Sequence, residues 1–157
     1  MPDPFQQPYL DSSVHIAAIK GEAGQVDTAR AIFSHARKGT FQVIASTLVI
    51  AEVIGAPRKT PLTEEQERVI DNYVFHDFIT WVELDQTIAL DARRLARQHG
   101  LKPADAVHVA SAIRAGADQL LRWDDKFTVP NGTYENVVVC EPHLAGLDVE
   151  IEGFHKA

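Results

Sequence analysis

Four acidic residues are spaced along the chain where a divalent metal site could be assembled. Asp11 lies in YLDSS, Glu52 in STLVIAEV, Asp105 in KPADAVHVASAI and Asp124 in LLRWDDKF. Carboxylates that converge without a partner raise one another's pKa and destabilise the fold, so a cluster of them implies a cation. Hard oxygen ligands without cysteine or paired histidine favour Mg²⁺ or Mn²⁺ over Zn²⁺. If these acids meet, we therefore expect a Mg²⁺ or Mn²⁺ site.

Each acid taken alone also has an ordinary structural explanation. Asp11 and Asp124 could cap helices, and Asp105 could complement the dipole of a first helical turn. Glu52 could be a solvated helix residue, but Leu48 and Val49 precede it by four and three positions on the expected helix. That spacing places Glu52 beside an apolar face. Because the four ordinary explanations are less convincing jointly than singly, the metal hypothesis is preferred.

The elements that must position these acids alternate between short apolar strands and longer amphipathic helices. A first strand is expected to end at Tyr9–Leu10, and further strands are expected over 41–45, 79–82, 119–121 and 136–140. A first helix is expected where an apolar stripe runs from Ala29 to Ala36. Further helices are expected to begin at Ser46 or Thr47, at Thr63, at Asp85 and at Pro103. Three of these are expected to end near Pro57, Gly100 and Gly116, respectively for the helices that begin at Ser46 or Thr47, at Asp85 and at Pro103. Such alternation is typical of an α/β domain with a mostly parallel sheet.

In an open parallel sheet, ligands bind at the carboxyl ends of the strands. Asp11 directly follows the end of an expected strand, Asp124 comes three residues after another, and Glu52 lies within about two helical turns of the end of the second strand. All four acids can therefore occupy one edge of the sheet. We expect a central sheet of four to five strands with helices on both faces, in a single domain over residues 1–157. Its core is expected over about 8–140, and 141–157 is a C-terminal extension whose structure the pattern leaves open.

The charge and cysteine content restrict the function less than the acids do. The 157-residue chain has a formal net charge of -7, which argues against nucleic-acid binding through bulk positive charge. It is compatible with a metal-dependent nuclease, because cations neutralise the acids of such a site. The single cysteine, Cys140, cannot form an internal disulfide, and no apolar stretch is long enough to span a membrane. A cytoplasmic protein without a membrane segment is therefore expected.

In order and spacing, the four acidic segments resemble the motifs of PIN-domain ribonucleases, particularly the toxins of VapBC toxin-antitoxin systems. The similarity runs from about Tyr9 to Cys140, and KPADAVHVASAI is its most specific motif. The resemblance implies a three-layer PIN-like α/β fold and Mg²⁺- or Mn²⁺-dependent hydrolysis of RNA phosphodiester bonds. It also implies a small antitoxin partner and homodimers.

Carried over position by position, the resemblance implies that Asp11, Glu52, Asp105 and Asp124 form the metal site, with Ser13 as a neighbouring hydroxyl. Asp11 and Asp105 are the best candidates for direct ligands. Glu52 and Asp124 would complete the shell or hold water.

The fourth motif contains two adjacent acids and one departure from the family's pattern. Asp124 is preferred over Asp125 because the family spaces its acid three residues before a Phe, here Phe127. Where the family usually has Thr or Ser, this chain has Arg122. We expect its planar guanidinium to bind a substrate phosphate, with a surface ion pair as the alternative.

The sequence leaves several alternatives open. His108 could act as a general base, although its position beside the expected core stripe favours a structural role. The chain could be a stand-alone PIN nuclease without an antitoxin, or a non-catalytic PIN-like interaction module. A haloacid-dehalogenase-type phosphatase is a poor fit, because it would need an Asp where Ser13 stands. A phospho-acceptor receiver is also a poor fit, because it would need an early pair of adjacent acids and a phospho-accepting Asp at the end of the third strand, and the sequence shows neither.

Overall fold

The computed structural model describes residues 2–53, 60–123 and 129–147. In chain order its elements are β1 (Pro8–Leu10), α1 (Ser12–Lys20), α2 (Val26–Arg37), β2 (Val43–Ser46), α3 (Leu48–Glu52), α4 (Glu64–Val74), β3 (Ile79–Val82), α5 (Gln86–His99), α6 (Pro103–Arg114), β4 (Gln119–Leu121), β5 (Gly132–Tyr134) and β6 (Val137–Cys140). The mixed α/β class predicted from the sequence is confirmed.

Six strands form one sheet in the order β3-β2-β1-β4-β6-β5. All neighbouring pairs are parallel except β5 and β6, which are antiparallel. In the residues that the structure describes, the expected number of four to five strands is therefore corrected to six. The additional strand, β5, was missed because its three residues, Gly-Thr-Tyr, include no apolar run and two of them are exposed.

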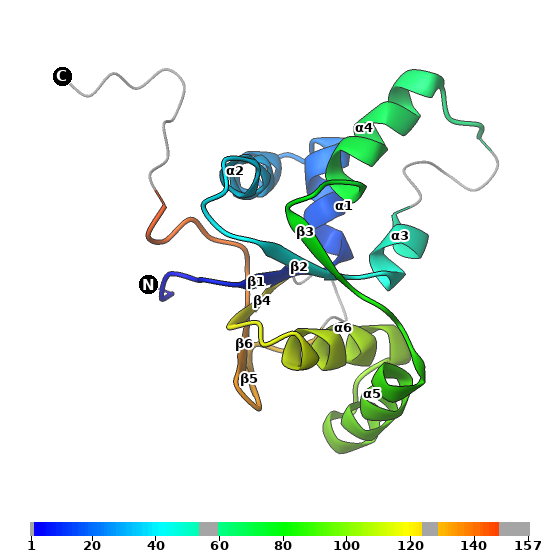
Figure 1. Cartoon of the computed structure of the whole chain (residues 1–157), viewed down its shortest axis with the longest axis vertical. Helices are drawn as coiled ribbons and strands as arrows, with labels where there is room; N and C mark the ends of the chain where they lie inside the picture. The colour runs from blue at the N-terminus through cyan, green and yellow to red at the C-terminus, as the bar shows by residue number, and fades with distance from the viewer. Residues whose placement is uncertain (1, 54–59, 124–128, 148–157) are drawn as a thin grey trace.

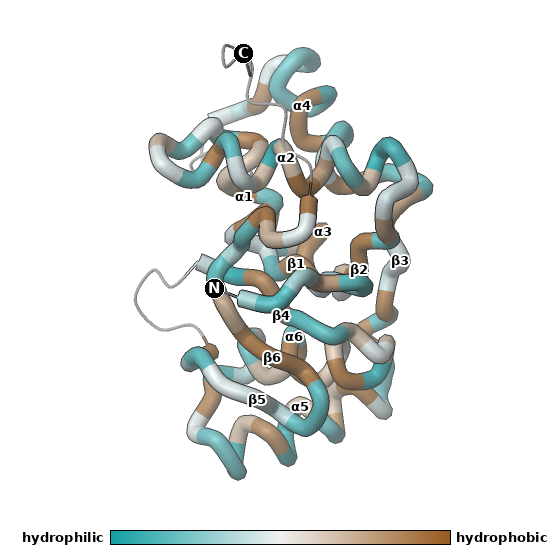
Figure 2. The backbone as a smooth tube through the Cα atoms, turned by 90° about the vertical axis from the view of Figure 1, so that its left-hand side faces the viewer, coloured by the Kyte–Doolittle hydropathy of each residue, from teal (hydrophilic) through white to brown (hydrophobic). Residues whose placement is uncertain are grey.

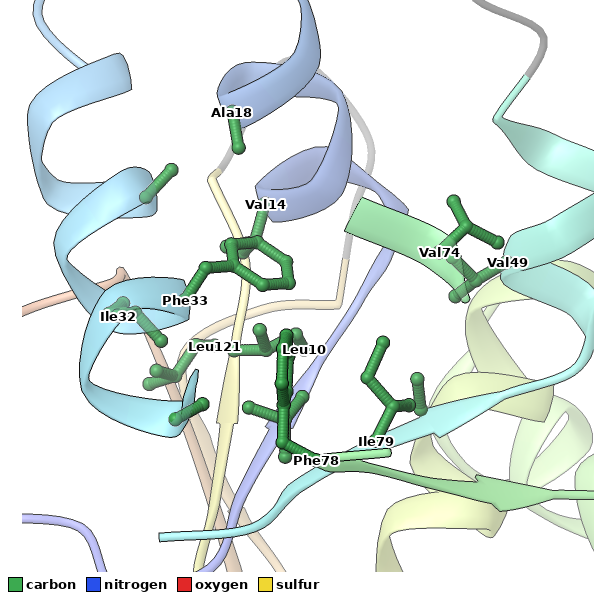
Figure 3. Packing of buried hydrophobic residues seen from close by; sticks show 14 of the residues in the cluster. Leu10, Val14, Ala18, Ile32, Phe33, Val49, Val74, Phe78, Ile79 and Leu121 are labelled. Atoms are coloured by element: carbon green, nitrogen blue, oxygen red, sulfur yellow. The ribbon is translucent and has the colours of Figure 1, made fainter. Parts of the chain in front are cut away.

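Helices cover both faces of the sheet and give a three-layer arrangement (Figure 1). On one face lie α1 and α2, with α4 packed against α1; on the other lies α6, with α5 packed on its outer side. Strand residues alternate between the two layers, since Leu10 and Leu121 belong to the core under α1 and α2 whereas Tyr9 and Leu120 belong to the core under α6. Figure 3 shows Leu10 and Leu121 side by side beneath Phe33 of α2.

Helix α1 was not predicted, and its burial explains why. Its buried residues, including Val14, His15 and Ala17, are not confined to one narrow stripe. A helix that is buried on most sides does not have one apolar and one polar face, and this contrast is what makes a helix recognisable from its sequence. In Figure 2 that contrast is visible along α4, where teal and brown segments follow one another.

The predicted ends of the longer helices are confirmed. Asp85 caps α5 by accepting a hydrogen bond from the Ile88 N–H at 2.8 Å, and Gly100 ends that helix with φ of 67°. Thr63 and Gln66 form a reciprocal capping box at the start of α4. Pro103 is the first residue of α6.

Two of the predicted boundaries lie next to residues that the structure does not describe. Helix α3 ends at Glu52, and Pro57, where its end was expected, lies outside the described residues. Residues 141–147 form neither helix nor strand. Among the helices of the described ranges, none is long and apolar enough to cross a membrane.

Candidate active site

The candidate site lies where the direction of the sheet's connections reverses. From β1 the chain proceeds to β2 and β3 on one side, whereas β4 pairs with the other side of β1. The carboxyl ends of β1 and β4 therefore form a topological switch point, the usual ligand position in open α/β sheets. Asp11 immediately follows β1. Asp124 and Asp125 follow β4 by three and four positions and lie outside the described residues.

Asp11 is buried, with 8% of its surface exposed, and it caps helix α1. Its Oδ1 accepts hydrogen bonds from the Ser13 backbone N–H at 2.9 Å and from the Ser13 hydroxyl. Ser13 Oγ in turn accepts a hydrogen bond from the Trp123 N–H at 3.0 Å. Ser13 therefore joins the end of β1 to the segment after β4 and is placed directly beside the first acid.

Glu52 is oriented by two side chains from other helices. Its Oε1 accepts a hydrogen bond from Ser12 Oγ at 2.6 Å and is 2.7 Å from His108 Nε2. About a third of the Glu52 side chain is exposed, whereas the His108 side chain is 4% exposed. Glu52 therefore has one oxygen fixed against the protein and a partly open carboxylate.

His108 is hydrogen-bonded at both ring nitrogens. Its Nδ1 lies 2.6 Å from the Tyr9 hydroxyl, which also accepts a hydrogen bond from the Ser46 N–H at 3.2 Å. The network therefore connects α6 to β1 and β2, and through Glu52 to α3. These contacts give His108 the structural position that the sequence analysis favoured over a general base.

Asp105 occupies the first turn of α6 and is partly exposed. Burial raises its pKa, the charge of His108 lowers it, the charge of Glu52 raises it and Lys102 lowers it, with a net increase. These mutual effects arise because the start of α6 and the end of α3 lie at the same edge of the sheet.

The three described acids differ in which protonation state the fold favours. Burial raises the pKa of Asp11, and this outweighs the opposing effects of His108 and Ser13; the charge of Glu52 adds to the increase. For Glu52, burial would raise the pKa, but the hydrogen bond and charge of His108, with the Ser12 hydrogen bond, lower it overall. Ionised Asp11 and Asp105 are thus disfavoured in the bare fold, which is the condition that a cation relieves.

The donor chemistry fits a hard divalent cation, although the described acids do not form a closed ligand set. In the ranges that the structure describes, no three His, Cys, Asp or Glu side chains are grouped closely enough to hold a metal ion. The acids Asp11, Glu52 and Asp105 offer carboxylate oxygens at one edge, as Mg²⁺ and Mn²⁺ prefer. A site built on them would use further oxygens, from the fourth motif or from water.

Arg122 does not have the position that was predicted for it. Its side chain is 1% exposed, Nε donates to the Val129 carbonyl at 2.8 Å, and Nη2 donates to Asn131 Oδ1. A buried guanidinium with these partners is not presented to a substrate phosphate. We therefore correct the expected phosphate contact to a structural role, in which Arg122 joins the end of β4 to the chain before β5.

Replacing Arg122 with Ala is expected to lower the free energy of unfolding by about 2–4 kcal/mol, because it leaves a buried carbonyl unpaired and creates a cavity. Affinity for RNA should be unchanged at temperatures where the variant is folded. Thermal unfolding and RNA-binding titrations measure the two effects separately. Loss of RNA affinity in a variant of unaltered stability would restore the phosphate contact.

Three residues of the network were not identified from the sequence as parts of the site. They are Ser12, which bonds to Glu52; Tyr9, which bonds to His108; and Ser46, which bonds to Tyr9. These hydrogen bonds connect residues 37 to 99 positions apart. The only local signal was the serine pair after Asp11 in YLDSS. The pairings themselves depend on the order of strands in the sheet.

The sequence matches one family model and two curated relatives. The family model described as PIN domain matches residues 9–130. Two curated relatives from Mycobacterium tuberculosis, Ribonuclease VapC45 of strain CDC 1551 / Oshkosh and Ribonuclease VapC49 of strain ATCC 25618 / H37Rv, are each 32% identical over 123 residues, covering 74% of this chain and 83% of the relative.

Solved structures with low sequence identity share the fold. The crystal structure of M. tuberculosis VapC20, described as a Sarcin-Ricin loop cleaving toxin, aligns with a TM-score of 0.60 at 14% identity, covering 76% of this chain and 92% of that chain. VapBC2 from Rickettsia felis, bound to a DNA fragment from its promoter, aligns with a TM-score of 0.59 at 16% identity, covering 87% and 98%. A toxin-antitoxin complex from Klebsiella pneumoniae aligns with a TM-score of 0.57 at 18% identity, covering 83% and 95%.

Proposed function

The chain belongs to the PIN-domain family, and from this premise we propose that it is a Mg²⁺- or Mn²⁺-dependent endoribonuclease, the cytoplasmic toxin of a VapBC-type pair. The observation that supports the proposal is that Asp11, Glu52 and Asp105 lie at the carboxyl edge of the sheet, near its switch point, where the charge of Glu52 raises the pKa of each of the other two acids. The names of its curated relatives, both ribonucleases, support the reaction class.

In the proposed reaction, the protein's acids hold the metal and orient the reactants. Asp11 and Asp105 would be direct ligands, with Asp124 completing the shell or holding water, and Ser13 keeps the Asp11 carboxylate in one orientation. Bound there, Mg²⁺ or Mn²⁺ would activate the attacking water and stabilise negative charge on the phosphate. Glu52, kept ionised by His108 and Ser12, would complete the shell or hold water.

The proposal is tested first by incubating the purified chain with a mixed pool of structured and single-stranded RNAs. Cleavage is expected with Mg²⁺ or Mn²⁺, none with EDTA, and recovery when the metal is restored. Gel analysis of the RNA measures this directly. Cleavage that persists in EDTA would contradict metal dependence, and no cleavage of any RNA with either metal would favour the non-catalytic interaction module.

Metal binding is tested without relying on activity. Because a ligand that binds only the folded state stabilises it by RT ln(1 + [L]/Kd), Mg²⁺ or Mn²⁺ should raise the unfolding midpoint of the wild type. The variant Asp105→Asn should show a smaller shift, because it loses one of the proposed ligands. Equal shifts in the two proteins would exclude Asp105 from the metal site.

The proposed partner is a small antitoxin, and we also propose a homodimer. Solved neighbours described as a VapBC pair and as a toxin-antitoxin complex support the first. Both proposals are tested by co-expressing the chain with any short open reading frame that immediately precedes its gene and measuring the mass of the purified species by light scattering. A monomer that captures no such protein would favour a stand-alone nuclease.

A further inference from the structure

Helix α5 carries an exposed basic stripe on the side away from the core. Its residues are spaced three or four positions apart, so they lie on one side of the helix, and they line an open pocket of about 460 Å³. We call this surface the arginine stripe; its residues are Leu90, Arg93, Arg94, Arg97 and Gln98. The opposite side of the same helix is the one that packs against the protein, through Ile88, Ala92 and Leu95. The arginine stripe therefore makes no contribution to the core.

The charge of this stripe is opposite to that of the whole chain. Helix α5 contains three arginines and one aspartate, in a protein whose net charge is -7. Arg94 forms an ion pair with Glu135 at 3.3 Å, which holds it towards the turn between β5 and β6. Within the described ranges, Arg93 and Arg97 are exposed and lie in no ion pair with a carboxylate. Their two guanidinium groups are thus available to an anionic partner.

The stripe leads towards the acidic edge of the sheet. Helices α5 and α6 pack against each other and are joined by a short turn in which the Leu101 N–H bonds to the Ala96 carbonyl at 3.1 Å. The last turn of α5, with Arg97, is therefore adjacent to the first turn of α6, with Asp105 (Figure 1). Arg93 and Arg97 lie about 6 Å apart along the helix axis, at 1.5 Å per residue.

We propose that the arginine stripe binds the phosphate backbone of the RNA substrate and directs it to the acidic edge. This inference rests on the proposed function. Carboxylates at the site repel a polyanion, so an acidic nuclease needs separate positive contacts to hold RNA nearby. Arginine suits this task because its planar fork matches phosphate oxygens and stays charged at every physiological pH. Such contacts also release counterions, which makes the binding salt-dependent.

The test compares two double variants of the full chain that remove the same charge. Arg93→Gln/Arg97→Gln alters the stripe, whereas Arg68→Gln/Arg114→Gln removes two exposed arginines from α4 and from the far end of α6. Affinity for a fluorescent single-stranded RNA is measured by anisotropy in EDTA over a range of salt concentrations. Each lost phosphate contact should reduce the slope of log K against log salt by roughly 0.7. The stripe variant should therefore lose about 1.4 of slope and the control almost none.

Cleavage kinetics give an independent readout. The stripe variant should show an increased KM with nearly unchanged kcat, because its arginines contact RNA equally in the ground and transition states. Equal slopes and equal KM values in the two double variants, alongside wild-type cleavage, would overturn the stripe while leaving the nuclease proposal intact. A wild type that neither binds nor cleaves RNA would overturn both. Weakened binding of polyglutamate with unchanged RNA affinity would overturn the inference in favour of an acidic protein partner.

Discussion

Replacing Asp11 with Asn is expected to reduce metal-dependent RNA cleavage by more than about 100-fold, because even groups that only support metal ligands contribute 10- to 100-fold. The fold should survive, since the amide oxygen of Asn can still accept the Ser13 N–H that Asp11 accepts at 2.9 Å. Cleavage of a defined RNA at saturating Mg²⁺, together with circular dichroism, measures both effects.

Asp105→Asn should show a similar loss, and Asp27→Asn provides the matched control. Asp27, like Asp105, is an acid in the first turn of its helix, but it lies on α2 and is exposed. If Asp27→Asn reduced cleavage as much as the two site variants, the loss would be a general effect of removing negative charge. Retained cleavage in both Asp11→Asn and Asp105→Asn would exclude these acids as the metal ligands.

The same substitutions should not reduce stability in the absence of metal. Because the folded-state pKa values of Asp11 and Asp105 are raised, the protonated forms favour folding, and this contribution is lost as pH rises through those values. Above those pKa values the ionised acids therefore oppose folding. We expect the unfolding midpoints of both variants in EDTA to equal or exceed that of the wild type. A functional site is the usual place where a protein retains such unfavourable charges.

Removing His108 is expected to have the second large effect. His108→Ala leaves the Glu52 carboxylate and the Tyr9 hydroxyl without their common partner, and it creates a cavity in α6. We expect about 2–4 kcal/mol of lost stability and a 10- to 100-fold loss of cleavage, as for groups that orient metal ligands. Thermal unfolding and cleavage at saturating metal measure the two quantities.

Two companion variants separate positioning from packing. Val109→Ala removes a fully buried neighbour on the same helix that lies in the apolar core, so it should lower stability with little effect on cleavage of the folded protein. His108→Gln retains a donor near the Nε2 position and should recover part of the activity. If Val109→Ala lost as much activity as His108→Ala at equal stability, His108 would have no specific positioning role.

The stability lost in His108→Ala should depend on pH in a defined way. Burial would lower the pKa of His108, but Glu52 and the other acids raise it overall. The contribution of charged His108 to the free energy of unfolding is therefore complete below the ordinary pKa of 6.5, and it declines as pH rises through the raised pKa. Glu52 has a lowered pKa, so its contribution is complete above its ordinary value of 4.5 and declines at lower pH. The difference between wild type and variant in EDTA should therefore be greatest between these two values.

The sequence predicted most of the fold because its signals were local. Strand runs such as Ile79–Val82 and helix ends at Asp85 and Gly100 depend on neighbouring residues, and the structure confirms them. Helix α1 and strand β5 were missed for the opposite reason, since burial on most sides and a three-residue length erase the periodicity on which such predictions depend.

The elements that carry Asp11 and Asp105 could be predicted from the sequence, whereas the contacts that support Glu52 could not. The position of Asp11 after β1 and of Asp105 at the start of α6 follows from chain order. The contacts of Glu52 with Ser12 and His108 join residues 40 and 56 positions apart, and no local pattern encodes them. Arg122 shows the same limit, because its burial depends on partners beyond β4 that composition does not reveal.

Helix α3 has five residues, and an isolated helix of that length is not stable in water. Its last residue, Glu52, therefore depends on Ser12 and on His108 for its orientation, and His108 lies in the last third of the chain. A growing polypeptide that has emerged only as far as β3 would hold Asp11 and Glu52 but neither Asp105 nor the anchor of Glu52. The proposed nuclease would thus remain inactive on the ribosome until α6 has been synthesised and packed.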